Sequence, residues 1–197
     1  MKKIRICAGL LCIMLLLSSC VAKKVEAETE ETKKESGEKA EESVKVDFES
    51  VIVSDYVYAY VGENANLNIE GTGFISSKPS IADVDANGIV TPKQTGVALV
   101  GYVKGAESKA IAVCVMADGE KPDRASGGSA ELIEVGKSYM HSSPVGNAEY
   151  TSSNSAVCDI SAAPELKFVG CGYVCINCNS VSRPFSYSFI VYDRIVE

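Results

Sequence analysis

The sequence predicts an all-β protein that consists of two small antiparallel β-sandwiches in tandem. Beyond the first 20 residues, no stretch has the apolar stripe of an amphipathic helix. Short runs rich in Val, Ile and Tyr follow one another instead, and Gly, Asn, Ser and Pro separate them. The order of these runs occurs twice, with a period of about 75 residues. Several short strands in each copy, with no helix, are typical of a small sandwich.

The first segment, residues 1–19, has the layout of a secretory signal peptide, in which cations precede an apolar run from Ile6 to Leu17. As a helix this run of about 12 residues spans roughly 18 Å, whereas the hydrocarbon core of a bilayer is about 30 Å thick. The tetrapeptide Leu17-Ser18-Ser19-Cys20 resembles the lipobox of bacterial lipoproteins. This resemblance implies that residues 1–19 are removed and that Cys20 carries the lipid. It also implies that the protein is anchored to the cell membrane and exposed outside the cytoplasm.

A disordered stalk is expected for residues 20–46, which begin with the lipidated cysteine. The segment is dense in Glu and Lys and contains no aromatic residue. Such a composition cannot bury enough apolar surface to offset the entropy lost on ordering. A flexible coil of this length reaches roughly 28 Å, enough to hold the rest of the chain clear of the membrane.

Two sandwiches are predicted to follow, at residues 47–117 and 129–193, with a link at 118–128 that contains Pro122 and should bend. The landmarks of the first copy are Gly62, Phe74-Ile75-Ser76-Ser77, Ile81–Asp85 and Gly96, and those of the second are Gly136, Tyr150-Thr151-Ser152-Ser153, Val157–Ile160 and Gly170. The distance in sequence from Ser76-Ser77 to Ser152-Ser153 is two residues longer than the distance from Gly62 to Gly136. The second copy therefore requires a two-residue insertion before Tyr150.

Alternation predicts which side chains face the core of the first sandwich. We expect Ala82 and Val84 to point inward, with Asp83 and Asp85 outward as solubilising charge rather than as glycosidase acids. After Gly96, the residues on one face should be Ala98, Val100 and Tyr102.

The first copy resembles the group-2 bacterial immunoglobulin-like domain, a module of invasins, intimins and other cell-surface proteins. The residues that carry the resemblance are Phe74 before Ser76-Ser77, the run Ile81–Thr91 and the run Gly96–Val100. The family usually has Trp before the Ser-Ser pair, and here Phe74 and Tyr150 supply the large core ring. The second copy is more divergent, because Ala163-Pro164-Glu165 replaces the Asn87-Gly88 turn. The resemblance implies two Ig-like sandwiches and no catalytic residues.

The chain beyond Cys20 holds an odd number of cysteines, so at least one cannot pair within a monomer. Alternation places Cys158 toward the core, and a Cys158–Cys178 disulfide is one pairing that remains open. The spacing of Cys171, Cys175 and Cys178 resembles the iron–sulfur motif of radical S-adenosylmethionine enzymes. On one strand, however, the first two lie about 13 Å apart and the third points to the opposite face. A zinc site that adds Cys158 lacks the usual paired spacing. We expect no metal and no cofactor.

Two sets of aromatic side chains are candidate sites. Tyr56, Tyr58 and Tyr60 alternate on one strand and could stack on sugars, but sheet packing or a domain contact is the favoured interpretation. His141, with the serines that follow it, lacks a nucleophile elbow. We expect it to be a solvated loop residue.

The formal net charge of −7 argues against a nucleic-acid partner. We therefore expect a non-enzymatic surface lipoprotein, anchored through the lipid on Cys20. Its Ig-like domains would serve adhesion, spacing or the binding of a protein or glycan. The alternative is an accessory subunit of a larger envelope complex that docks through the same domains.

Overall fold

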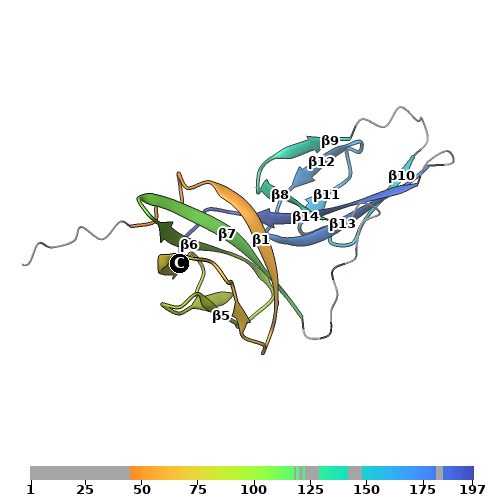
Figure 1. Cartoon of the computed structure of the whole chain (residues 1–197). Coiled ribbons are helices and arrows are strands. Elements are labelled where there is room, and N and C mark those ends of the chain that lie inside the picture. Colours follow the sequence, from red (N-terminus) through yellow and green to blue (C-terminus); the bar gives the residue numbers. More distant parts are fainter. Residues whose placement is uncertain (1–44, 118, 120–121, 123–128, 142–147, 181–183) are drawn as a thin grey trace, which may run out of the picture. The chain divides into compact units, whose positions relative to one another are not determined.

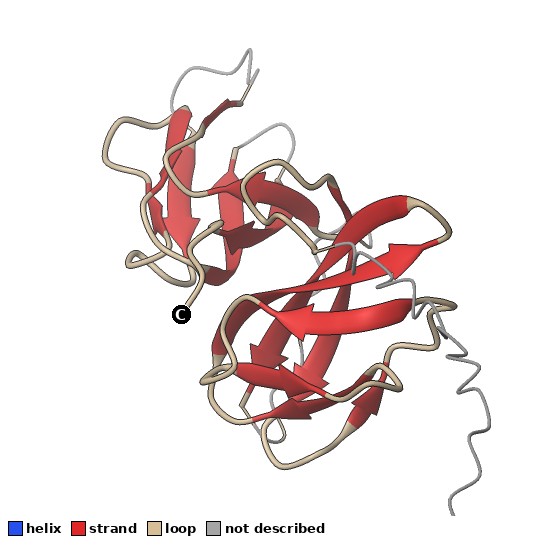
Figure 2. Cartoon of the chain, turned by 90° about the vertical axis from the view of Figure 1, so that its left-hand side faces the viewer, coloured by secondary structure: helices blue, strands red, loops and turns tan. Residues whose placement is uncertain are grey.

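The computed structural model describes residues 45–197, except 118, 120–121, 123–128, 142–147 and 181–183. Every regular element in this part is a β-strand (Figure 2), and none of it forms a helix long and apolar enough to cross a membrane. The predicted signal peptide, Cys20 and the stalk as far as residue 44 lie outside the described residues. The prediction of an all-β chain with two sandwiches is confirmed for the described part.

The first sandwich has two sheets (Figure 1), in which the sheet β1-β7-β6-β3 packs against the sheet β2-β5-β4. Adjacent strands are antiparallel except β1 and β7, which run parallel. The strands are β1 Val53–Tyr60, β2 Ala65–Asn66, β3 Thr72–Ser76, β4 Ala82–Val84, β5 Ile89–Pro92, β6 Gly96–Lys104 and β7 Glu107–Met116.

The second sandwich repeats this order, with the sheet β10-β13-β14-β8 and the sheet β11-β12-β9. Again the first strand, β8, runs parallel to the last, β14. The strands are β8 Glu131–Glu134, β9 Ser138–Met140, β10 Glu149–Ser152, β11 Cys158–Asp159, β12 Glu165–Phe168, β13 Gly172–Asn179 and β14 Phe185–Tyr192. In each sandwich the second, fifth and fourth strands form one sheet, and the third, sixth and seventh belong to the other. This is an immunoglobulin-like arrangement in which the first strand has joined the last.

Backbone geometry corrects one landmark of the repeat. Gly62 and Gly136 correspond as predicted, with φ of 88° and 86°. Gly96, however, corresponds to Gly172 and not to Gly170, because both have φ of 146° and both begin the sixth strand of their sandwich. The two-residue insertion lies between β9 and β10, as predicted, so the offset between the copies is larger from there on. Gly170 has a different role, since a Cβ there would collide with the carbonyl oxygen of Ala156.

The predicted inward faces of the first sandwich are confirmed. Ala82 of β4 is completely buried in its core. From the opposite sheet, Ala98, Val100 and Tyr102 of β6 point into the same core. Phe74 supplies the large ring expected before the Ser-Ser pair, and it stacks on Tyr102 with the ring centroids 5.8 Å apart.

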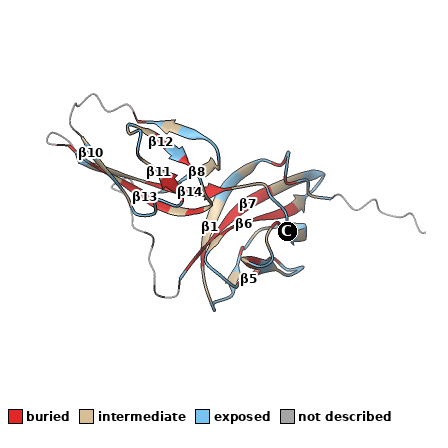
Figure 3. Ribbon diagram, turned by 180° about the vertical axis from the view of Figure 1, so that it is seen from behind, coloured by how far each residue is buried: buried red, intermediate tan, exposed pale blue. Residues whose placement is uncertain are grey.

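Strands β6 and β7 are buried on both faces (Figure 3). In β7, Ile111, Val113 and Val115 point into the core of the first sandwich, whereas the residues between them point outward. The outward side chains pack with residues of the second sandwich in an apolar group that we call the inter-sandwich cluster. Its buried members are Phe48, Val51, Val97, Leu99, Ala110, Ala112, Cys114, Met116, Ile190 and Tyr192.

The tyrosines of β1 lie against the inter-sandwich cluster. The ring of Tyr58 meets that of Tyr173 edge to face, with centroids 6.1 Å apart. The hydroxyl of Tyr56 accepts a hydrogen bond of 2.9 Å from the backbone N–H of Ala130. The prediction that this stripe serves packing or a domain contact is confirmed. Residues 42–197 accordingly form one compact unit.

Gly101 of β6 allows the segment before β1 to lie flat on the outer face of the sheet. A Cβ at this position would collide with Cγ1 of Val46 and would lie 3.1 Å from Cζ of Phe48. Phe48 is only 4% exposed as a result of this approach. Within the described residues, packing onto the first sandwich therefore begins at Val46.

The substitution Gly101→Val should lift Val46 and Phe48 off the sheet. We expect it to lower the free energy of unfolding by about 1–3 kcal/mol, because the added side chain overfills a packed site. The amide of Val51, which donates to the carbonyl of Asp47 at 3.0 Å, should exchange faster with solvent. Thr91→Val, at an exposed position of β5, is the matched control and should change neither quantity. Unchanged exchange at Val51 in the Gly101 variant would contradict this account.

Candidate binding groove

The chain that follows β14 returns to the first sandwich, where Arg194 holds it in place. One guanidinium nitrogen, Nη1, donates hydrogen bonds of 2.9 Å to the carbonyl oxygens of Phe48 and Val51. Its Nε lies 3.2 Å from a carboxylate oxygen of Glu134 in β8. A single side chain thus ties together the segment before β1, the tail and a strand of the second sandwich. Its charge is therefore already engaged within the protein.

A second polar contact centres on the carboxylate of Asp193. The ammonium of Lys78 lies 2.7 Å from one of its oxygens, and the thiol of Cys171 donates to the other at 3.0 Å. Burial acts to raise the pKa of Asp193, but the hydrogen bonds from Cys171 and Lys78 outweigh it and lower the pKa. Burial and the bond to Asp193 raise the pKa of Cys171 to about 11, so this sulfur is a protonated donor near neutral pH. These residues join the two sandwiches rather than forming a reactive centre.

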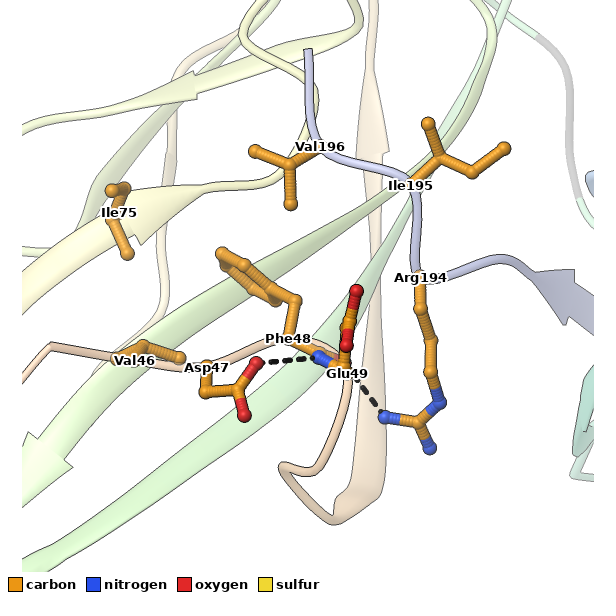
Figure 4. A pocket seen from close by; sticks show the side chains of 8 residues that line it. All are labelled: Val46, Asp47, Phe48, Glu49, Ile75, Arg194, Ile195 and Val196. Carbon is orange, nitrogen blue, oxygen red and sulfur yellow. Dashed lines mark hydrogen bonds between the residues drawn. The ribbon is translucent and has the colours of Figure 1, made fainter.

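Between the segment before β1 and the tail lies an open groove with a volume of about 620 Å³ (Figure 4). The tail is held beside the end of β3, because the N–H of Glu197 donates to the carbonyl of Ser77 at 2.9 Å. In Figure 4 Val196 of the tail and Phe48 of the segment before β1 lie on opposite sides of the hollow, and Ile75 borders it. The lining residues are Val46, Asp47, Phe48, Glu49, Ile75, Arg194, Ile195 and Val196.

The groove combines an apolar centre with an acidic margin. Ile75, Ile195 and Val196 are 48%, 66% and 54% exposed, and adjacent exposed apolar side chains often mark an interaction site. Asp47 and Glu49 are exposed on the segment before β1. Hydrogen bonds from the hydroxyl of Ser50 and the N–H of Glu49 lower the pKa of Asp47. The groove therefore offers apolar contact beside two carboxylates.

The sequence did not single out any residue of this groove. The adjacent apolar pair Ile195-Val196, at the end of an otherwise polar tail, was the available signal. Its partner Ile75 is marked in the sequence only as part of a repeat landmark. The tail is about 120 residues from Ile75 and about 147 from Phe48 in the sequence, and only the docking of the second sandwich onto the first brings them together.

His141 is not the solvated loop residue that was expected. It is 8% exposed, and its ring stacks on Phe185 with the centroids 4.2 Å apart. Nδ1 lies 3.2 Å from the hydroxyl of Tyr150, and Nε2 lies 3.3 Å from the hydroxyl of Tyr187. A neutral imidazole can donate to one hydroxyl and accept from the other. Burial lowers the pKa of His141, so the neutral form is favoured in the folded protein.

Cys158 and Cys178 occupy separate places in the second sandwich. Cys158 lies in its core, as alternation predicted, and burial raises the pKa of this thiol to about 11. Cys178 of β13 is also completely buried but is not a member of that core cluster, and both sulfurs are thiols in the structure. Within the described residues, no three His, Cys, Asp or Glu side chains are placed to hold a metal ion.

Comparison with protein-family models gives no match, and neither does comparison with characterised proteins. Among solved structures, a bacterial Ig-like domain containing GH10 xylanase from termite gut matches 41% of this chain and 24% of its own, at 15% identity and a TM-score of 0.29. Domains 4 and 5 of the S-layer protein SbsC match 60% of this chain and 68% of theirs, at 21% identity and a TM-score of 0.24. The insect immune protein hemolin matches 72% of this chain and 46% of its own, at 11% identity and a TM-score of 0.21. Likeness at this level carries no argument about function, and the Ig-like assignment rests on strand order.

Stability should rise with pH through the range in which His141 titrates. Its folded pKa is lowered, so the unfolded chain, with a pKa near 6.5, binds more protons between the two values. The stabilising effect is complete above about 6.5 and is lost as the pH falls toward the folded pKa. Denaturant titrations over this range should show that the free energy of unfolding rises with pH, and His141→Gln should reduce this rise. Equal slopes in the two proteins would contradict the assignment.

Thiol counting tests the pairing of Cys158 with Cys178, which the sequence leaves open. Because both sulfurs are thiols in the structure, we expect the denatured chain to give the same count before and after reduction. A deficit of two before reduction, absent in Cys178→Ser, would establish the disulfide instead.

Proposed function

We propose that this chain is a non-enzymatic bacterial surface lipoprotein whose two Ig-like sandwiches act together as one binding unit. The anchor is supported by the Leu17–Cys20 tetrapeptide, which resembles a lipobox and follows the apolar run of a signal peptide. The Glu- and Lys-rich residues 21–44 would then separate the anchor from the sandwiches. The group-2 bacterial type of the modules is part of the proposal and is supported by the sequence pattern around Phe74 and Ile81–Thr91.

The groove beside Ile75 is the observation that carries the binding role. Three exposed apolar side chains meet there around a volume of about 620 Å³. The polar contacts of Arg194 and Asp193 fix both walls, so the site is formed before any partner arrives. A preformed site loses little entropy on binding. A role as a spacer alone would not account for these exposed side chains.

The residues with catalytic potential are engaged elsewhere, which supports a role without turnover. Both nitrogens of His141 lie at hydrogen-bonding distance from tyrosine hydroxyls. Asp83 pairs with Lys93 at 3.0 Å on the surface, and Asp85 accepts hydrogen bonds from the turn at Asn87. Both carboxylates thus serve local structure.

Replacing Cys20 tests the anchor. In cells fed a labelled fatty acid, we expect Cys20→Ala to abolish labelling and to move the protein out of the membrane fraction, because the acyl chains supply the membrane affinity. Cys12→Ala changes a cysteine within the segment that is removed, so labelling and location should persist. Membrane-bound, labelled Cys20→Ala protein would rule out the proposed lipidation.

Crosslinking on intact host cells tests the binding role. We expect the wild-type chain to form discrete adducts outside the cytoplasm, and we expect Ile75→Asp to form fewer. A complex of fixed stoichiometry in membrane extracts, unaffected by Ile75→Asp, would favour the accessory-subunit alternative. The absence of adducts would contradict the binding role and leave the anchor untouched.

A further inference from the structure

We propose that the groove between Phe48 and Val196 binds an extended peptide segment of a protein partner, with an apolar side chain in the hollow and basic residues beside it. This inference rests on the proposed binding role, and it names the chemical class of the partner. It is carried by the lining of the groove, by the strand at its edge and by its charge.

The lining favours an apolar side chain over a sugar. Ile75, Ile195 and Val196 offer aliphatic surface without hydrogen-bonding groups. Phe48 is the one aromatic among the eight lining residues, and at 4% exposed it presents no open ring on which a pyranose could stack. A buried aliphatic side chain of a partner would gain about 1.5–3 kcal/mol from leaving water.

The neighbouring strand favours an extended peptide. Ile75 lies in β3, which pairs with β6 on one side and ends its sheet on the other. The open edge of such a strand presents backbone N–H and C=O groups to which a peptide can add as a further strand. A peptide in that position would place alternate side chains over the groove.

The charge favours a basic segment and opposes a second copy of this chain. Asp47 and Glu49 stand exposed at the margin, and the low pKa of Asp47 keeps that carboxylate ionised. The one cation in the lining, Arg194, is engaged by two carbonyl oxygens and Glu134. Two copies, each with a formal net charge of −7, would repel one another, whereas Lys or Arg in a partner would be attracted.

Selection from a displayed library of random linear peptides provides the test. The full chain, purified in detergent, serves as bait, and the selected peptides are synthesised and titrated by fluorescence anisotropy. We expect enrichment of peptides in which Val, Ile or Leu stands near Lys or Arg. Ile75→Asp and Val196→Asp should each weaken binding about tenfold or more, because a charge then enters the apolar hollow. Binding to the wild type should weaken as ionic strength rises.

Matched variants separate the groove from a general surface effect. Ile52→Asp changes an equally apolar and more exposed side chain, 76% exposed, outside the groove and should bind as the wild type does. The pair Asp47→Asn and Glu49→Gln should reduce both affinity and its salt dependence, whereas Glu63→Gln should not. Thermal unfolding of each variant should show that the fold is retained, because all these side chains lie at the surface.

Four outcomes would overturn the inference. They are enrichment of acidic peptides or of none, affinity that Ile75→Asp leaves unchanged, glycan binding that Ile75→Asp abolishes, and self-association that Ile75→Asp disrupts. None of these bears on lipidation at Cys20. If the crosslinked adducts on intact cells survive Ile75→Asp, the proposed binding role stands and only the groove is excluded.

Discussion

Burial of both faces of β6 and β7 is the constraint on which the rest of the structure depends. One face of each strand fills the core of the first sandwich, and the other meets the second sandwich in the inter-sandwich cluster. A lone sandwich would leave that outer face, with Leu99, Ala112 and Met116, exposed to water. The second sandwich and the segment before β1 cover it together, and the close fit at Gly101 sets how near that segment can come. The positions of the tail, of Arg194 and of the groove all follow from this docking.

The fold was largely predictable from the sequence, because strand alternation and turn residues are local signals. The core-facing Ala82, the ring at Phe74 and the insertion before β10 were all predicted. The docking of the second sandwich onto the first also has a signal in the sequence, although it was not among the predictions. Residues Ala110–Met116 are apolar at every position, which indicates a strand buried on both faces. In β14, aromatic residues alternate with serine from Phe185 to Ser188, whereas every residue from Phe189 to Tyr192 is apolar or aromatic. This second half of the strand reaches the inter-sandwich cluster.

The sites were less predictable, because each depends on side chains that the fold gathers from distant positions. His141 is buried because three aromatic rings surround it. Tyr150 comes from β10, whereas Phe185 and Tyr187 come from β14, more than 40 residues after His141 in the sequence. The local sequence around His141 carries no signal of this burial. Likewise, the structural role of Asp193 depends on its ion pair with Lys78, which lies 115 positions earlier. Gly170 looked like the partner of Gly96, yet the backbone gives that place to Gly172, and the two-residue insertion before Tyr150 requires the same shift.

Val46 and Val196 line the same groove, although almost the whole described chain lies between them. A force applied through the chain preceding Val46 and resisted by a ligand in the groove would therefore not stretch either sandwich. It would act on the short segment from Val46 to Val51, which Arg194 clamps through two carbonyl oxygens and which Phe48 anchors in the apolar cluster. Such a load would peel this segment from the sheet one contact after another. The mechanical strength of the attachment would then depend on these few contacts more than on the two β-sandwich cores.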